Sequence, residues 1–193
     1  SDHAKQGSSK TFIALIQTES ERLQKKDPDT KSGIVQTKWV DIIGANVNLA
    51  GAELDLIAMD HREARLKLVL DKVKDEYDYV FIDCPPSLGL LTLNCLCAAD
   101  SFLVPLQCEY YALEGLSQLM TTVRMVKKNM NPKLSLEGVL LTMFDGRTNL
   151  SIQVVEEVKK HFPGEVFSSV VPRNVRLSEA PSHGKPITEY DRM

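Results

Sequence analysis

An aspartate at the end of an apolar strand pattern is the first residue whose position suggests chemistry. Asp83 closes the run Tyr77-Asp-Tyr-Val-Phe-Ile-Asp83, and the pair Pro85-Pro86 follows one residue later. β-Branched and aromatic residues stopped by prolines predict a strand that ends in a turn. A carboxylate held there can orient a water bound to Mg²⁺, although an aspartate in this place is also a common cap. Asp83 is therefore a candidate magnesium residue.

Two further strand patterns also end on polar residues. Asp145 follows the pattern over 136–144, and Pro172-Arg-Asn174 follows the pattern over 166–171. Ligands of a parallel sheet bind at the carboxyl ends of its strands. We expect these residues to lie with Asp83 at the ligand-binding edge.

The elements that must position these residues alternate between strands and helices. Apolar periodicity predicts strands over 39–43, 77–83, 102–106, 136–144 and 166–171, and helices over 11–26, 62–74, 88–98, 113–128 and 151–161. Such alternation is typical of βαβ units, and predicts a doubly wound, mainly parallel sheet with helices on both faces. We expect one α/β domain over 1–193, with strands 79–83, 102–106 and 138–143 in the same sheet.

Composition narrows the class of protein. The 193 residues are 43% hydrophobic and 25% charged, which excludes a disordered chain, a fibrous repeat and a small disulfide scaffold. The longest run without a charge, Cys84 to Ala99, has sixteen residues and is too short to span a bilayer. The polar start Ser1-Asp-His-Ala-Lys5 does not read as a secretory signal. No membrane partner is expected.

Charge is distributed unevenly along the chain. The net charge is −3, but residues 1–120 carry −6 and residues 121–193 carry +3. The basic last part is compatible with an anionic partner at the C-terminal end, but on charge alone ordinary variation of surface charge is the favoured interpretation.

The four cysteines are Cys84, Cys95, Cys97 and Cys108. None has zinc-ligand spacing to another cysteine or a histidine, and all lie in or beside apolar runs. They are predicted to be buried reduced thiols of a cytoplasmic protein.

Four segments of the chain are specific enough to compare with a known family: Tyr77–Asn94, Pro105–Gly115, Leu140–Leu150 and Val171–Pro186, with Asn48–Glu53 preceding them. Over about Val40 to Asp191 the chain resembles ParA/Soj chromosome- or plasmid-partitioning ATPases, the deviant Walker P-loop family. The resemblance implies a P-loop NTPase-like fold, with ATP and Mg²⁺ as cofactors. The chain differs from the family pattern in two respects. Part of the family's N-terminal strands is not found in this sequence, and neither is the family's last helix.

The resemblance implies a nucleotide site in residues 1–38, an atypical P-loop and switch I region that precedes the well-matched core over 39–193. The loop Lys5-Gln-Gly-Ser-Ser-Lys-Thr11 stands where the family has K-G-G-V-G-K-T. Gly7 would let the backbone approach the phosphates, Lys10 would neutralise them and Thr11 would bind magnesium. Lys5 would reach the nucleotide of a second protomer, and Asp27 would activate water. Gln6 and Ser9 depart from the family's glycines, which puts hydrolysis in question.

The resemblance also assigns binding residues near the C-terminal end. Arg147 and Arg176 fall in segments similar to the family's sequence-independent DNA-binding surface, and arginine suits phosphate because its planar fork donates two hydrogen bonds. Pro172 and Asn174 stand where related ATPases hold the adenine.

The function implied is that of an ATP-dependent partitioning protein. Such a protein forms a homodimer on ATP, binds double-stranded DNA without sequence preference, is stimulated by a centromere-binding ParB-like protein and is cytoplasmic and nucleoid-associated. The alternative is a non-hydrolysing remnant that binds DNA or a partner protein without a nucleotide site. A MinD-type membrane ATPase would need a C-terminal amphipathic helix, and an iron–sulfur carrier would need cysteines placed between subunits, so both rank lower.

Overall fold

The structure is a computed structural model that describes residues 11–15, 31–38, 40–44, 49–84 and 87–191. The chain divides into two compact units, which we describe separately. The first unit comprises residues 1–100 and 122–134, and the second comprises residues 101–121 and 135–193.

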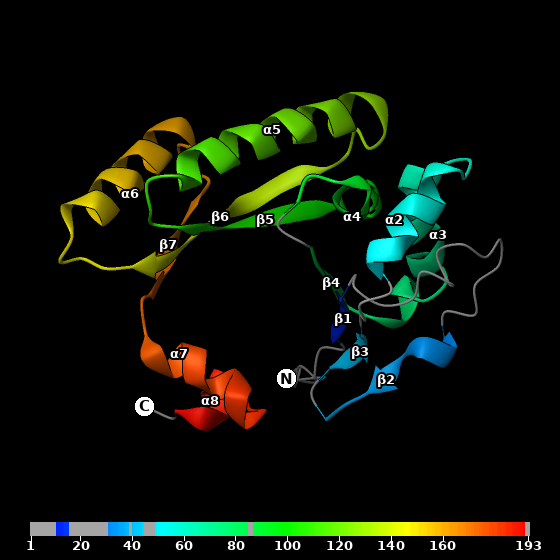
Figure 1. Cartoon of the computed structure of the whole chain (residues 1–193), viewed down its shortest axis with the longest axis horizontal. Coiled ribbons are helices and arrows are strands. Elements are labelled where there is room, and N and C mark those ends of the chain that lie inside the picture. The colour runs from blue at the N-terminus through cyan, green and yellow to red at the C-terminus, as the bar shows by residue number, and fades with distance from the viewer. Residues whose placement is uncertain (1–10, 16–30, 39, 45–48, 85–86, 192–193) are drawn as a thin grey trace, which may run out of the picture. The chain divides into compact units, whose positions relative to one another are not determined.

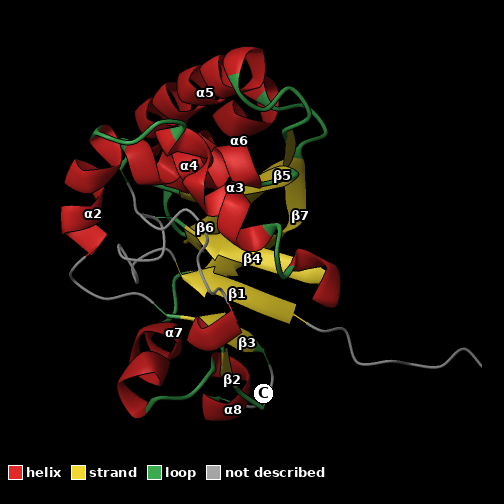
Figure 2. Ribbon diagram, turned by 90° about the vertical axis from the view of Figure 1, so that its right-hand side faces the viewer, coloured by secondary structure: helices red, strands yellow, loops and turns green. Residues whose placement is uncertain are grey.

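The first unit contains a four-stranded sheet with the order β2-β3-β1-β4. Its strands are β1 (Thr11–Leu15), β2 (Val35–Gln36), β3 (Asp41–Ile43) and β4 (Tyr79–Asp83). β1 pairs in parallel with both β3 and β4 (Figure 2). Leu15 lies opposite Asp83 at the carboxyl ends of β1 and β4. The short strand β2 is antiparallel to β3.

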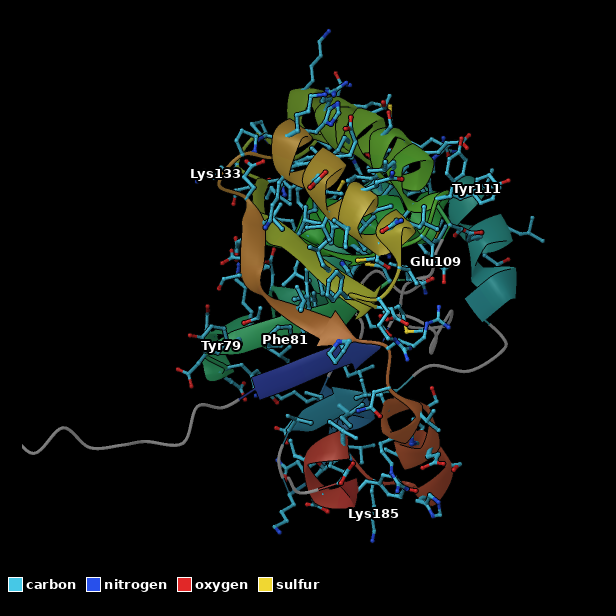
Figure 3. The ribbon with its side chains drawn as sticks, turned by 90° about the vertical axis from the view of Figure 1, so that its left-hand side faces the viewer. Tyr79, Phe81, Glu109, Tyr111, Lys133 and Lys185 are labelled. Carbon is cyan, nitrogen blue, oxygen red and sulfur yellow. The ribbon has the colours of Figure 1, made fainter. Side chains whose placement is uncertain are left out.

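Helices cover one face of this first sheet. They are α2 (Leu49–Ile57), α3 (Arg65–Leu70) and α4 (Leu90–Ala98), with 3-10 turns at Lys31–Gly33, Arg62–Ala64 and Lys74–Glu76. Val80 and Ile82 of β4 pack against a buried cluster made by Leu56, Leu66, Val69, Leu70, Leu91 and Cys95. Successive side chains of a strand point to opposite faces, so Tyr79 and Phe81 lie on the other face, exposed and stacked with ring centroids 6.4 Å apart (Figure 3).

Asp41 and Tyr77 connect the strand β3 to the segment that leads into β4. The Tyr77 hydroxyl donates a hydrogen bond of 2.8 Å to Asp41 Oδ2. Burial, together with this bond to a carboxylate, raises the pKa of Tyr77 to about 12. The phenol therefore stays protonated and keeps its donor role across the physiological range.

The second unit contains a three-stranded parallel sheet with the order β5-β6-β7. Its elements are β5 (Ser101–Gln107), β6 (Ser135–Phe144) and β7 (Val166–Pro172), with helices α5 (Ala112–Asn129), α6 (Asn149–His161), α7 (Val175–Glu179) and α8 (Ile187–Tyr190) and a 3-10 turn at Ala180–His183. The first turns of α5 and the whole of α6 lie on one face of the sheet (Figure 1). Val104, Leu106, Val139 and Leu141 of the sheet pack there against Leu116, Val154 and Val158 of the helices.

The α/β class and the mainly parallel strand pairing agree with the sequence prediction. Strands at 79–83, 101–107, 135–144 and 166–172 lie where periodicity placed them. Of the three strands expected in one sheet, those at 102–106 and 138–143 are parallel neighbours in the second unit, whereas 79–83 belongs to the sheet of the first unit. Periodicity identifies a strand but carries no information on its neighbour.

One predicted helix is also wrong at its start. Residues Thr11–Leu15 form β1 and not the first turns of a helix over 11–26. Phe12, Ile13 and Leu15 give an apolar run too short for its period to distinguish the two states. Strand pairing on both sides, with β3 and with β4, decides in favour of β1.

The backbone of Gly138 in β6 is closely packed against the segment that leads into β7, and an alanine variant tests this packing. A β-carbon there would lie 2.7 Å from Phe167 Cε2 and 3.0 Å from the Glu165 carbonyl oxygen. That carbonyl accepts a hydrogen bond from the Val139 N–H and cannot retreat without breaking it. We expect Gly138→Ala to lower the free energy of unfolding by about 1–3 kcal/mol, measured by urea denaturation.

Gly115 in α5 is the matched control for this variant. A β-carbon at Gly115 meets nothing within 4 Å. Gly115→Ala is therefore expected to raise stability by about 0.5–1 kcal/mol through helix propensity. If Gly138→Ala and Gly115→Ala changed the free energy of unfolding equally, the close packing described at Gly138 would be wrong.

Candidate functional site

The carboxyl ends of β5, β6 and β7 meet at one edge of the second sheet, which we call the carboxyl edge. Backbone hydrogen bonds continue past the ends of the strands: the Cys108 N–H donates to the Thr142 carbonyl oxygen at 3.0 Å, and the Arg173 N–H donates to the Phe144 carbonyl oxygen at 3.0 Å. These bonds fix the first residues of the three following loops relative to one another. Asp145 and the Pro172–Asn174 segment, predicted to lie at such an edge, are both there.

Glu109 and Arg173 connect two of these loops. Arg173 Nη2 lies 2.8 Å from Glu109 Oε1, so the loop after β7 is paired with the loop after β5. The sequence analysis expected Arg173 at this edge as part of the Pro172–Asn174 segment, but it did not assign Glu109 to the site. The position of Glu109, two residues after β5, was the signal that could have identified it.

Arg147 forms a two-pronged ion pair with Asp145. Its Nε and Nη2 lie 2.9 and 2.7 Å from the two carboxylate oxygens, and its backbone N–H donates to Oδ1 at 3.1 Å. These bonds hold the pKa of Asp145 well below its usual range and raise the pKa of Arg147. The pair is therefore charged at neutral pH. The Arg147 side chain is nevertheless 88% exposed, so solvent or a ligand can reach the guanidinium.

Asn174 and Arg176 belong to the turn that opens α7. Asn174 Oδ1 accepts a hydrogen bond of 2.8 Å from the Arg176 N–H, which makes Asn174 the N-cap of this helix. Arg176 Nη1 lies 3.1 Å from Glu179 Oε2, and its Nε lies 3.9 Å from Asp191. Pro172, the last residue of β7, is exposed. The predicted adenine and DNA residues of this segment are thus neighbours.

Two exposed tyrosines stand beside the carboxyl edge. Tyr110 and Tyr111 are 72% and 78% exposed and meet edge to face with ring centroids 5.3 Å apart. Glu109 and Tyr111 lie together in Figure 3. At this exposure the two rings pack mainly against each other and leave most of their surface open to solvent.

Asp83 stands at the carboxyl end of β4 in the first unit, as predicted. It is the last residue of the strand, and it is exposed. Among the described residues, no three His, Cys, Asp or Glu side chains gather as a metal site. Asp83 thus offers a single exposed carboxylate at this strand end, the kind of hard oxygen donor that Mg²⁺ prefers.

Glu53 connects the segment after Asp83 to the rest of the first unit. Glu53 Oε1 accepts a hydrogen bond of 3.3 Å from the Leu91 N–H and so satisfies the first turn of α4. Cys84, the residue after Asp83, donates to the Ile82 carbonyl oxygen at 3.7 Å, and Cys95 of α4 donates to the Leu91 carbonyl oxygen at 3.0 Å.

Most of the predicted P-loop and switch I residues fall outside the part of the chain that the structure describes. Lys5, Gly7, Lys10 and Asp27 lie outside the described residues. Thr11 opens β1, whereas a P-loop places its threonine at the first turn of a helix. The magnesium role of Thr11 stays a prediction, made for a residue that begins a strand.

None of the described helices combines the length and the apolar character that a membrane crossing requires.

Comparison with known proteins identifies close relatives. A family model described as an AAA domain matches residues 4–136. The chain is 64% identical over 152 residues to the sporulation initiation inhibitor protein Soj of Bacillus subtilis, which covers 79% of this chain and 60% of that protein. It is 59% identical over 156 residues to the chromosome partitioning protein ParA of Myxococcus xanthus, covering 81% and 55%. The chain thus spans little more than half the length of these relatives.

Solved structures show the same fold. Cobyrinic acid a,c-diamide synthase from Mycobacterium smegmatis, with bound ADP and magnesium, aligns with a TM-score of 0.78 at 31% identity, over 92% of this chain and 84% of that one. A plasmid partition protein from Borrelia burgdorferi aligns with a TM-score of 0.72 at 21% identity, over 94% and 82%. At 21% identity, the similarity to the Borrelia burgdorferi protein shows a shared fold and no more.

Proposed function

Because the chain belongs to the ParA/Soj family of chromosome-partitioning ATPases, we propose that it is an ATP-dependent partitioning protein that binds double-stranded DNA without sequence preference. ATP joins two protomers in this proposal, and a centromere-binding ParB-like protein stimulates hydrolysis and release. The protein acts in the cytoplasm, on the nucleoid.

The observation that carries the DNA-binding part is the grouping of arginines at the carboxyl edge. Arg147 follows β6, and Arg173 and Arg176 follow β7, its parallel neighbour. All three are exposed and paired with carboxylates. Exposed ion pairs of this kind contribute little, so a guanidinium can exchange a carboxylate for a DNA phosphate at small cost.

The proposal that the chain binds ATP and Mg²⁺ is supported by its membership of the family and by the position of Asp83. A carboxylate is the hard oxygen donor that Mg²⁺ prefers, and this one is exposed at the carboxyl end of a parallel strand. Lys5, Gly7 and Lys10 would hold the phosphates, Pro172 and Asn174 the adenine, and Asp27 would position the attacking water. Bound ATP and Mg²⁺ supply the reactive phosphoryl group and part of the positive charge that its transfer requires.

A second candidate function follows from Thr11. Because this residue begins a strand, the chain is alternatively a remnant that binds DNA or a partner protein and does not hydrolyse ATP. Saturable, magnesium-dependent binding of a fluorescent ATP analogue favours the first candidate, and no such binding favours the second.

The DNA-binding proposal predicts the behaviour of arginine variants. Arg147→Ala and Arg176→Ala are each expected to weaken binding to unrelated duplexes to the same extent, because an interaction with phosphate carries no sequence information. Each should also lower the slope of log affinity against log salt by about one for every phosphate that the variant no longer binds. Fluorescence anisotropy with two duplexes over a range of salt measures both quantities, and dimerisation should be retained.

Lys133→Ala is the matched control. Lys133 is exposed and precedes β6 by two residues, whereas Arg147 follows the other end of that strand. The control variant should keep the parent's affinity and salt slope. If the Arg147/Arg176 double variant binds duplex DNA like the parent at equal salt, the basic end does not face DNA.

A further inference from the structure

Each of the three arginines at the carboxyl edge is paired with a carboxylate of the same unit. The pairs are Arg147–Asp145, Arg173–Glu109 and Arg176–Glu179. Each pair is electrically neutral as a whole. A phosphate that approaches the edge therefore meets as many negative as positive charges among these six side chains.

Asp145 holds its arginine more firmly than the other two carboxylates hold theirs. Its two oxygens accept from both Nε and Nη2 of Arg147, at 2.9 and 2.7 Å, whereas Glu109 and Glu179 each accept from one guanidinium nitrogen. Nε and Nη2 together form an edge of the guanidinium that can grip a carboxylate or a phosphate with two parallel hydrogen bonds. A phosphate that binds this edge of Arg147 must therefore displace Asp145.

The loop after β6 fixes the carboxylate and leaves the arginine at the surface. The side chain of Asp145 is 19% exposed, and that of Arg147 is 88% exposed. Asp145 Oδ1 also accepts from the Arg147 N–H at 3.1 Å, and the Asp145 carbonyl oxygen accepts from the Thr148 N–H and hydroxyl at 3.1 and 3.0 Å. The guanidinium can thus turn toward a ligand while the carboxylate stays in the turn.

We propose that Asp145 is an autoinhibitory residue of the DNA surface, which occupies the phosphate-binding edge of Arg147 until DNA displaces it. The inference rests on the DNA-binding function proposed above and adds a residue that regulates the affinity of that surface. Displacement breaks two charge-assisted hydrogen bonds and leaves an uncompensated negative charge beside a phosphate. Asp145 therefore lowers the affinity for DNA.

Asp145→Asn tests this role and keeps the turn, because an amide oxygen still accepts from the Arg147 N–H. We expect the variant to bind duplex DNA about 3- to 10-fold more tightly than the parent at equal salt, in fluorescence anisotropy with the full chain. Asp145→Ser, whose hydroxyl also accepts from a backbone N–H, is the second variant, should the first be unfolded by circular dichroism.

Glu137→Gln is the matched control. It removes one negative charge as well, but Glu137 is exposed near the amino end of β6, whereas Asp145 follows the carboxyl end of that strand. At that separation the charge is largely screened by salt, so the control should change the affinity by less than about 2-fold.

A double variant separates competition for Arg147 from a general effect of charge. In the Arg147→Ala background, Asp145→Asn should lose most of its gain in affinity, because no guanidinium is left for Asp145 to occupy. An equal gain in both backgrounds would overturn the inference, and so would an equal gain from Glu137→Gln.

Unchanged or weaker binding by folded Asp145→Asn would also overturn it, and weaker binding would make Asp145 a residue that positions Arg147 for DNA. In all these cases the parent binds duplex DNA, so the proposed function stands while the inference fails. If neither the parent nor Asp145→Asn binds duplex DNA, the proposed DNA binding fails and the inference fails with it.

Discussion

Replacing Asn94 by alanine is expected to lower the free energy of unfolding by about 2–4 kcal/mol. Asn94 lies in α4, is 1% exposed, and uses both ends of its amide. Its Oδ1 accepts from the Leu66 N–H at 3.1 Å, and its Nδ2 donates to the carbonyl oxygens of Arg62 and Leu90 at 2.8 and 3.0 Å. The alanine variant leaves these backbone groups short of partners in a buried place, which costs more than the hydrogen bonds contribute.

Urea denaturation of Asn94→Ala beside Asn129→Ala measures this effect. Asn129 is also helical and also bonds a backbone carbonyl, that of Met125 at 3.1 Å, but it is exposed. Water replaces its hydrogen bond when the side chain is removed, so the control should change stability by no more than about 0.5 kcal/mol. Similar losses in the two variants would mean that Asn94 does not anchor α4 to the segment that contains Arg62 and Leu66.

Asp83→Ala is expected to reduce magnesium-dependent ATP turnover by about 10- to 100-fold. The proposed carboxylate holds a magnesium-bound water, so its loss should shift the magnesium dependence of turnover more than the affinity for the nucleotide. Turnover measured against magnesium concentration, together with binding of a fluorescent ATP analogue, separates the two effects.

Asp78→Ala is the control for this variant, because Asp78 precedes the amino end of the same strand. It should leave the magnesium dependence unchanged. Equal turnover by Asp83→Ala and the parent would show that this carboxylate does not serve the metal. A parent that binds no nucleotide would establish the remnant function instead, and Asp83 would then have no metal to serve.

The elements of the second unit could be predicted well from the sequence. Residues 135–144 and 149–161 have long, clear periods, and Thr148 accepts a hydrogen bond from the Ser151 N–H as an N-cap should. Each pattern is local, so the residues that form the element also identify it. The same reasoning placed Asp83 and Asp145 at strand ends, because a polar residue after an apolar run marks the end of the run.

What could not be predicted depends on partners distant in sequence. Arg173 meets Glu109 across 64 residues, and Asn94 meets Leu66 across 28, so no local pattern marks either pair. Thr11–Leu15 was mistaken for a helix because five residues contain too little of either period. The state of this segment is decided by its two neighbouring strands.

The contact between Glu53 and Gly89 has a consequence for how this sequence can diverge. A methyl group at position 89 would lie 2.5 Å from Glu53 Oε1, so Gly89→Ala would push the carboxylate away from the Leu91 N–H. Shortening Glu53 would remove the same hydrogen bond. The first substitution at either position therefore loses the full stability that this hydrogen bond contributes. A second substitution at the other position then has no bond left to break and is close to neutral. This is epistasis between two sites, and descendants of this sequence should change at both positions or at neither.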